Sequence, residues 1–169
     1  LHTPRRLQRR VRQNPFDITI DQEFAAVISA CATRSSTRID TWINADIRQL
    51  YIALHKMGFA HSVEVWQEGD LVGGLYGVRI RGAFFGESMF SRHTDASKIA
   101  LVHLMARLRH GGFRLLDAQF SNEHLKQFGV IDVPRIDFQR RLADALAAEA
   151  NLHLTAPSLP MVTEMLAAG

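Results

Sequence analysis

The stretch from Gly82 to Phe120 constrains the fold of this chain more than any other part of the sequence. It opens with the β-rich run AFFGESMF and continues through the polar segment SRHTDASK into apolar residues that recur at helical spacing. Gly111 and Gly112 end that pattern, and a second β-rich run extends from Phe113 to Phe120. The stretch therefore predicts a strand, a polar loop, a long helix and another strand.

Four polar residues stand among the apolar residues of the two strands: Glu87, Ser88, Asp117 and Gln119. An unpaired carboxylate on an apolar strand is costly, so Glu87 and Asp117 need partners or a function. Asp117 and Gln119 lie two residues apart, which on a strand places both side chains on one face. Such a pair could hold or deprotonate an amine. It could also simply end a strand in solvent.

The other elements extend this pattern along the chain. We expect helices capped by Asp21 and by Asn44, a long helix capped by Thr94 or Asp95, a short helix opened by Ser121 or Asn122, and a helix over 137–149. The expected strands cover residues 16–20, 61–66, 71–80, 83–90, 113–120 and 130–133. We expect a polar turn over 34–40 and no clear structure after Asn151. The order β-α-α-β-β-β-α-β-α-β is that of the N-acetyltransferase-like acyltransferase fold, a mixed α/β (α+β) sheet flanked by helices, which hosts several acyl donors.

Composition narrows the class of protein. A chain of 169 residues with 47% hydrophobic and 22% charged residues is ordinary for one globular domain. Its apolar runs are too short for a membrane span, and its first residues lack the pattern of a signal peptide. The single cysteine, Cys31, fits a reducing cytoplasm. The eight histidines show no zinc-site spacing, so we expect no metal.

The positive charge is concentrated near the start of the chain. The formal net charge is only +3, yet the segment PRRLQRRVR carries five arginines before the first acidic residue, Asp17. Guanidinium groups at this density suit contact with phosphates, although a solvated arm would look the same. The loop SRHTDASK offers Arg92 and Lys98 as further phosphate ligands. It has no glycine, which disfavours a loop that cradles coenzyme A.

Longer motifs extend over most of the chain. GESMFSR is followed by ASK, HGG and LLDAQ, and the flanking motifs TWI, HSVEVWQEGDLVGGLYGV and VPR extend the match from Leu1 to Phe138. Together they resemble the leucyl/phenylalanyl-tRNA–protein transferases, which attach Leu or Phe from aminoacyl-tRNA to protein N-termini. The resemblance implies a catalytic domain over residues 1–150, with a basic arm over 1–15 and a tail over 151–169. The family has a further domain upstream of LHTPRR.

The resemblance also implies a function. The chain would move Leu, Phe or Met from aminoacyl-tRNA to proteins that begin with Arg or Lys, marking them for degradation, as a cytoplasmic monomer without cofactor or membrane. Two alternatives stay open: a short relative that acylates a small-molecule amine, and a tRNA-binding protein without turnover. The carboxylates favour an enzyme, because a pure binder has no need of them in a cleft.

The same resemblance assigns roles to individual residues. Asp117, Gln119 and Glu87 would be the central residues, with Glu87 selecting a cationic acceptor. Trp42 would stack on the terminal adenosine of the tRNA, although it could also be a core residue. An apolar donor pocket would be lined by Leu75, Met89, Leu101, Leu104, Leu108 and Leu116, which on periodicity alone are core positions. The tRNA backbone would contact Arg5, Arg6, Arg9, Arg10, Arg92 and Lys98.

Overall fold

The computed structural model describes residues 3–33, 41–119 and 123–168. The strands are β1 (Asp17–Ile20), β2 (Ala60–Gln67), β3 (Asp70–Ile80), β4 (Ala83–Ser91) and β5 (Leu115–Asp117). The helices are α1 (Arg5–Arg12), α2 (Phe24–Ala32), α3 (Ala45–Lys56), α4 (Ala96–His110), α5 (Glu123–Lys126), α6 (Arg135–Ala147) and α7 (Ser158–Ala167). No helix of the described part of the chain is both long and apolar enough to cross a bilayer.

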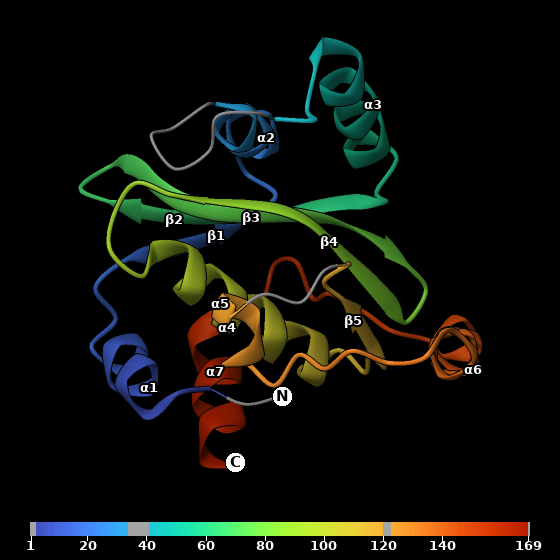
Figure 1. Ribbon diagram of the computed structural model, residues 1–169. Helices are drawn as coiled ribbons and strands as arrows, with labels where there is room; N and C mark the ends of the chain where they lie inside the picture. Colours follow the sequence, from blue (N-terminus) through green and yellow to red (C-terminus); the bar gives the residue numbers. More distant parts are fainter. Residues whose placement is uncertain (1–2, 34–40, 120–122, 169) are drawn as a thin grey trace.

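The strands form one mixed sheet in the order β1-β2-β3-β4-β5. Pairing is antiparallel from β1 to β4, whereas β5 runs parallel to β4 because α4 crosses over between them. Helices α2 and α3 cover one face of the sheet, and α1, α4 and α7 lie on the other (Figure 1). From β1 to β5 the element order is the predicted β-α-α-β-β-β-α-β, which confirms the mixed α/β fold class.

Each face of the sheet has its own hydrophobic core. On the α4 face, residues of α4 and α7 pack with Val63, Leu75 and Phe84 of the sheet. On the opposite face, α2 and α3 pack around Tyr76. Helix α4 sits very close to β3, since a Cβ atom on Gly73 would come within 2.6 Å of the Ala96 Cβ. Gly73 therefore fixes the start of α4 directly against the sheet.

Of the predicted helix caps, Asn44 is confirmed, whereas Asp21 and Asp95 do not cap. The side chain of Asn44 caps α3 by accepting a hydrogen bond from the Ile47 amide at 2.9 Å, as the sequence predicts. Asp21 caps no helix, which corrects the prediction. Its carboxylate instead accepts from the Ser62 amide at 2.8 Å and contacts the His61 ring at 2.7 Å. Asp95 precedes α4 but makes no capping bond either: its backbone is left-handed, and its carboxylate pairs with Arg6 and Lys98.

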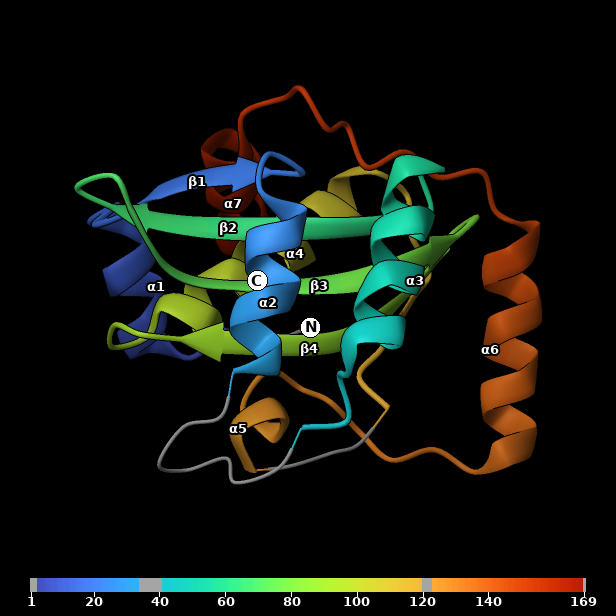
Figure 2. The same ribbon diagram turned by 90° about the horizontal axis from the view of Figure 1, so that it is seen from above.

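The structure differs most from the predicted elements in the second half of the chain. The strand predicted over 113–120 is only three residues long, and residues 130–133 form no strand. The segment after Asn151 is not without structure, because α7 packs against α4 in the core. Helix α6 begins two residues earlier than expected and stands at one end of the sheet (Figure 2). The predicted turn over 34–40 and the helix start at Ser121 or Asn122 lie outside the described residues.

Candidate functional site

Glu87 lies at an irregularity of the sheet. In the β3/β4 ladder Tyr76 faces Ser88, but the next residue, Gly77, faces Gly86, which leaves Glu87 as the extra residue of a β-bulge. Met89 packs against the α4 core, and strict alternation would send Glu87 to that same face. The bulge instead turns the Glu87 carboxylate toward α3, on the opposite face of the sheet.

The carboxylate of Glu87 meets the hydroxyl group of Tyr51 on α3. Burial, together with the charge and the hydrogen bond of Glu87, raises the pKa of the Tyr51 hydroxyl well above its usual value. Tyr51 therefore stays protonated and donates to the carboxylate. Tyr51 was not predicted from the sequence; its only signal was its position on the helix that follows the TWI motif.

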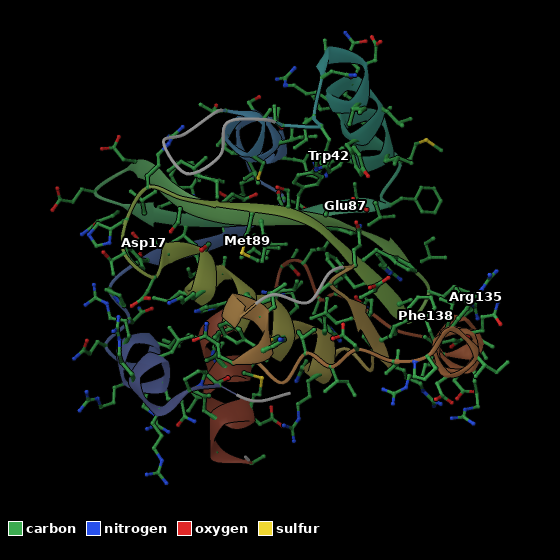
Figure 3. The ribbon with its side chains drawn as sticks, in the orientation of Figure 1. Asp17, Trp42, Glu87, Met89, Arg135 and Phe138 are labelled. Atoms are coloured by element: carbon green, nitrogen blue, oxygen red, sulfur yellow. The ribbon has the colours of Figure 1, made fainter. Side chains whose placement is uncertain are left out.

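Trp42 belongs to the same neighbourhood. Its ring meets the ring of Tyr51 edge-on, with centroids 6.2 Å apart, and Tyr51 contacts Tyr76 in the same way at 5.2 Å. The Trp42 residue is 51% exposed, so it is not a core residue. In Figure 3, Trp42 and Glu87 lie on the α3 side of the sheet, whereas Met89 lies on the α4 side. An exposed indole thus stands beside a held carboxylate.

Asp117 ends β5 and lies opposite Phe85, two residues before Glu87 on the neighbouring strand. Leu116 packs against the α4 core, so alternation turns the Asp117 side chain toward the face that carries Glu87. Gln119 is not part of the strand, which corrects the same-face prediction. Its backbone has φ of 62°, and its amide donates to Asp117 Oδ1 at 2.8 Å. Asp117 therefore also shapes the turn that places Gln119.

A groove of about 1050 Å³ begins at Asp117 and Gln119. One wall is the outer edge of β5 with Phe113, and the other wall comes from residues 129–133 and from α6. Arg135 and Phe138 of α6 line the groove. Figure 3 labels both side chains on this helix. This arrangement leaves room for an extended ligand next to the two polar residues.

The six predicted pocket residues occupy different places. Leu75 and Met89 face each other across β3 and β4, and Leu75, Leu101, Leu104 and Leu108 are buried in the α4 core. Leu108 and Leu116 also line the groove. Leu104 instead borders a separate cavity of about 10 Å³, below β1 and β2. Their role as a donor pocket stays a prediction, since all six pack in or against the core.

The predicted phosphate ligands are only partly available. Arg6 pairs with Asp95 at 2.9 Å, and Lys98 pairs with the same carboxylate at 3.1 Å. Burial opposes ionisation of Asp95, but these two cations outweigh it and lower its pKa. Arg92 donates to the Leu71 carbonyl and lies over the Phe90 ring. Arg10 lies over the ring of Phe16.

A fully buried carboxylate, Glu64, was also missed from the sequence. It accepts hydrogen bonds from Thr19 at 2.6 Å and from Ser62, and Trp66 donates to Thr19. These hydrogen bonds give the Glu64 carboxylate its partners within β1 and β2, so the network is structural. No three His, Cys, Asp or Glu side chains gather into a metal site among the described residues. The expectation of no metal stays a prediction.

Known proteins similar in sequence to this chain share one family description. A family described as leucyl/phenylalanyl-tRNA protein transferase matches residues 1–143. The chain is 60% identical over 159 residues to the leucyl/phenylalanyl-tRNA–protein transferase of Phenylobacterium zucineum, covering 94% of this chain and 72% of that protein. The protein of the same name from Paramagnetospirillum magneticum is 60% identical over 149 residues, covering 88% and 71%.

A third similar protein of that name, from Rhodopseudomonas palustris, is 55% identical over 163 residues, covering 96% of this chain and 72% of its own length. Among solved structures, a ribosomal-protein-alanine N-acetyltransferase from Brucella melitensis biovar Abortus aligns with a TM-score of 0.44 and 15% identity. That alignment covers 80% of this chain and 92% of the other.

Proposed function

Because the chain belongs to the leucyl/phenylalanyl-tRNA protein transferase family, we propose that it moves Leu, Phe or Met from aminoacyl-tRNA to proteins that begin with Arg or Lys. It is an aminoacyl-tRNA-dependent aminoacyltransferase of the leucyltransferase type. We also propose that the modified proteins are degraded, and that the chain acts in the cytoplasm, where charged tRNA is found, as a monomer without a cofactor.

The reaction requires both substrates to be positioned, whereas the donor ester is already activated. The α-amine of the acceptor attacks the ester carbonyl carbon, a C–N bond forms, and the ester C–O bond breaks. The ribose oxygen of the tRNA leaves with a proton, and the amine loses one. Since the α-amine has a pKa near 8, part of it is already neutral at pH 7. The protein must hold both substrates together and stabilise the charge that develops.

The position of Glu87 carries the proposal. Its carboxylate is half-buried, held by Tyr51, and lies on the side of the sheet where Trp42 is exposed. A fixed carboxylate next to an exposed ring suits a cationic side chain beside a stacked base. Asp117 lies opposite Phe85, two residues before Glu87 on β4, and can hold the attacking amine. We assign Glu87 to the acceptor side chain and Trp42 to the donor adenosine.

The test compares acceptor peptides that differ only in their first residue. With Leu-tRNA, peptides beginning with Arg or Lys should gain one leucine, observed by mass spectrometry, and an Ala-initiated peptide should gain little. Glu87→Gln should raise KM for the Arg-initiated peptide about 10-fold to 100-fold, because a charge-assisted contact worth roughly 1.5–3 kcal/mol is lost. The Ala-initiated peptide should be affected little.

The control is Glu68→Gln, which removes a carboxylate from the exposed β2–β3 turn. It should change neither acceptor. Equal losses for the Arg- and Ala-initiated peptides would contradict the assignment of Glu87 to the acceptor side chain. Transfer to small amines in preference to every peptide would instead identify a small-molecule acyltransferase.

Helix α1 suggests a second experiment, on the tRNA. Leu7 and Val11 anchor the helix in the core, so Arg5, Arg9 and Arg12 project outward, whereas Arg6 already pairs with Asp95. Replacing those three outward arginines by Gln should weaken tRNA binding. The log–log salt slope should fall by roughly 0.7–0.9 for each lost phosphate contact.

Fluorescence anisotropy with labelled tRNA at several salt concentrations measures both quantities. The control removes the same charge elsewhere, through Lys56→Gln, Arg81→Gln and Arg140→Gln. An α1 variant with the slope of the control would assign these arginines to solvent.

A further inference from the structure

We propose that the groove beside β5 binds an extended, acidic segment of the acceptor protein, just downstream of its first residue. This inference rests on the proposed function, because it takes the acceptor N-terminus to lie at Glu87 and Asp117. It adds a second binding site, which would read residues that do not react.

The shape of the groove suits a peptide in extended conformation. It begins at Asp117, where the reacting amine is placed, and follows β5 back toward Phe113. Among the described residues β5 is the last strand of the sheet and pairs with β4 alone, so its outer edge can take part in backbone pairing. From Phe113 to Asp117 an extended chain covers roughly 13 Å at about 3.3 Å per residue. That length accommodates about four acceptor residues.

The charges of the groove select the chemistry of that segment. Four arginines line it: Arg109, Arg114, Arg135 and Arg141. Within the described part of the chain, none of their guanidinium groups has an ion-pair or hydrogen-bond partner. Only two acidic residues, Asp117 and Asp132, share the lining. The groove therefore has a surplus of available positive charge and favours Asp and Glu side chains in its occupant.

The apolar part of the lining favours a peptide over an RNA backbone. Phe113 and Phe138 line the groove as well as the arginines, together with valine and isoleucine of residues 130–133. A phosphodiester backbone gains little from such surfaces, whereas alternating side chains of an extended peptide can use both the apolar pockets and the cations. The open strand edge adds backbone hydrogen bonds that RNA cannot match in register.

The experiment varies residues three to five of an Arg-initiated acceptor while its length stays fixed. The peptides carry acidic, amide or basic side chains there, and an Arg-Ala dipeptide amide serves as the minimal acceptor. KM for leucine transfer should be about tenfold lower for the acidic peptide than for the amide peptide, as expected from two or three exposed charge pairs. The double variant Arg135→Gln/Arg141→Gln should remove this difference and leave transfer to the dipeptide unchanged.

The matched control is Arg140→Gln, on the same helix but paired with Asp137 at 2.8 Å and absent from the groove. It should keep the preference. Anisotropy with the labelled acidic peptide, measured without tRNA, reports binding independently of turnover. Binding to wild type that weakens about tenfold in the double variant would support the groove even if every Arg-initiated acceptor failed to react. In that case only the proposed function would fail.

Three results would overturn the inference. The first is equal KM values and equal binding for acidic and amide peptides. The second is an equal loss of dipeptide transfer in the double variant, which would show that the arginines support the reaction site. The third is weaker binding of tRNA in the double variant with an unchanged peptide preference, which would assign the groove to RNA.

Discussion

Replacing Asp117 by Asn should lower the rate of leucine transfer by about 10²-fold or more while the protein stays folded. The side-chain oxygen that accepts from the Gln119 amide is retained in Asn, so the turn after β5 is preserved. Only the negative charge near the attacking amine is lost. The measurement is the single-turnover rate with saturating Leu-tRNA and an Arg-initiated peptide, with circular dichroism to monitor the fold.

The dependence of this loss on pH distinguishes two roles of the carboxylate. If Asp117 accepts the proton, the variant should recover part of its rate as the pH rises past the α-amine pKa of about 8, because the amine then enters neutral. If Asp117 only positions the amine, the loss should be the same at every pH. The control is Asp144→Asn on the exposed side of α6, which removes an equal charge. A near-wild-type rate in folded Asp117→Asn would contradict both roles.

The sequence predicts the sheet and its crossover well, because those elements follow from local patterns. Strands β2, β3 and β4 alternate or run apolar between clear turns, and α4 has strong helical spacing that ends at a glycine pair. The cap at Asn44 is equally local. The fold class and the approximate positions of Glu87 and Asp117 therefore follow from residues that are close together in the chain.

The details of the site depend on contacts between distant segments. The bulge at Glu87 arises from the register between β3 and β4, and no pattern within β4 reveals it. Its partner Tyr51 comes from a helix more than thirty residues upstream. β5 is short because the chain turns through the left-handed conformation of Gln119, which a strand pattern of alternating residues does not anticipate. The charge partner and the orientation of each polar residue are thus tertiary properties.

On the opposite face of the sheet, the contacts of Arg107 are likewise not visible in the local sequence. Its position in an apolar helix gave no signal, yet it is almost completely buried, and burial lowers its pKa. The guanidinium donates to the backbone carbonyl groups of Leu152, His153 and Ala156 and to the Ser158 hydroxyl. A single side chain of α4 thereby ties the segment before α7 into the core.

Arg107→Met should therefore lower the free energy of unfolding by about 3 kcal/mol, because several buried acceptors lose their donor and each costs roughly 1–3 kcal/mol unless water reaches it. Urea unfolding followed by circular dichroism measures the loss. Arg109→Met, an exposed neighbour on α4, is the control and should change stability by less than about 0.5 kcal/mol. Hydrogen exchange should show the loss of protection concentrated in α7, since α4 keeps its contacts with the sheet. A variant as stable as the control, with α7 still protected, would show that packing alone holds this helix against α4.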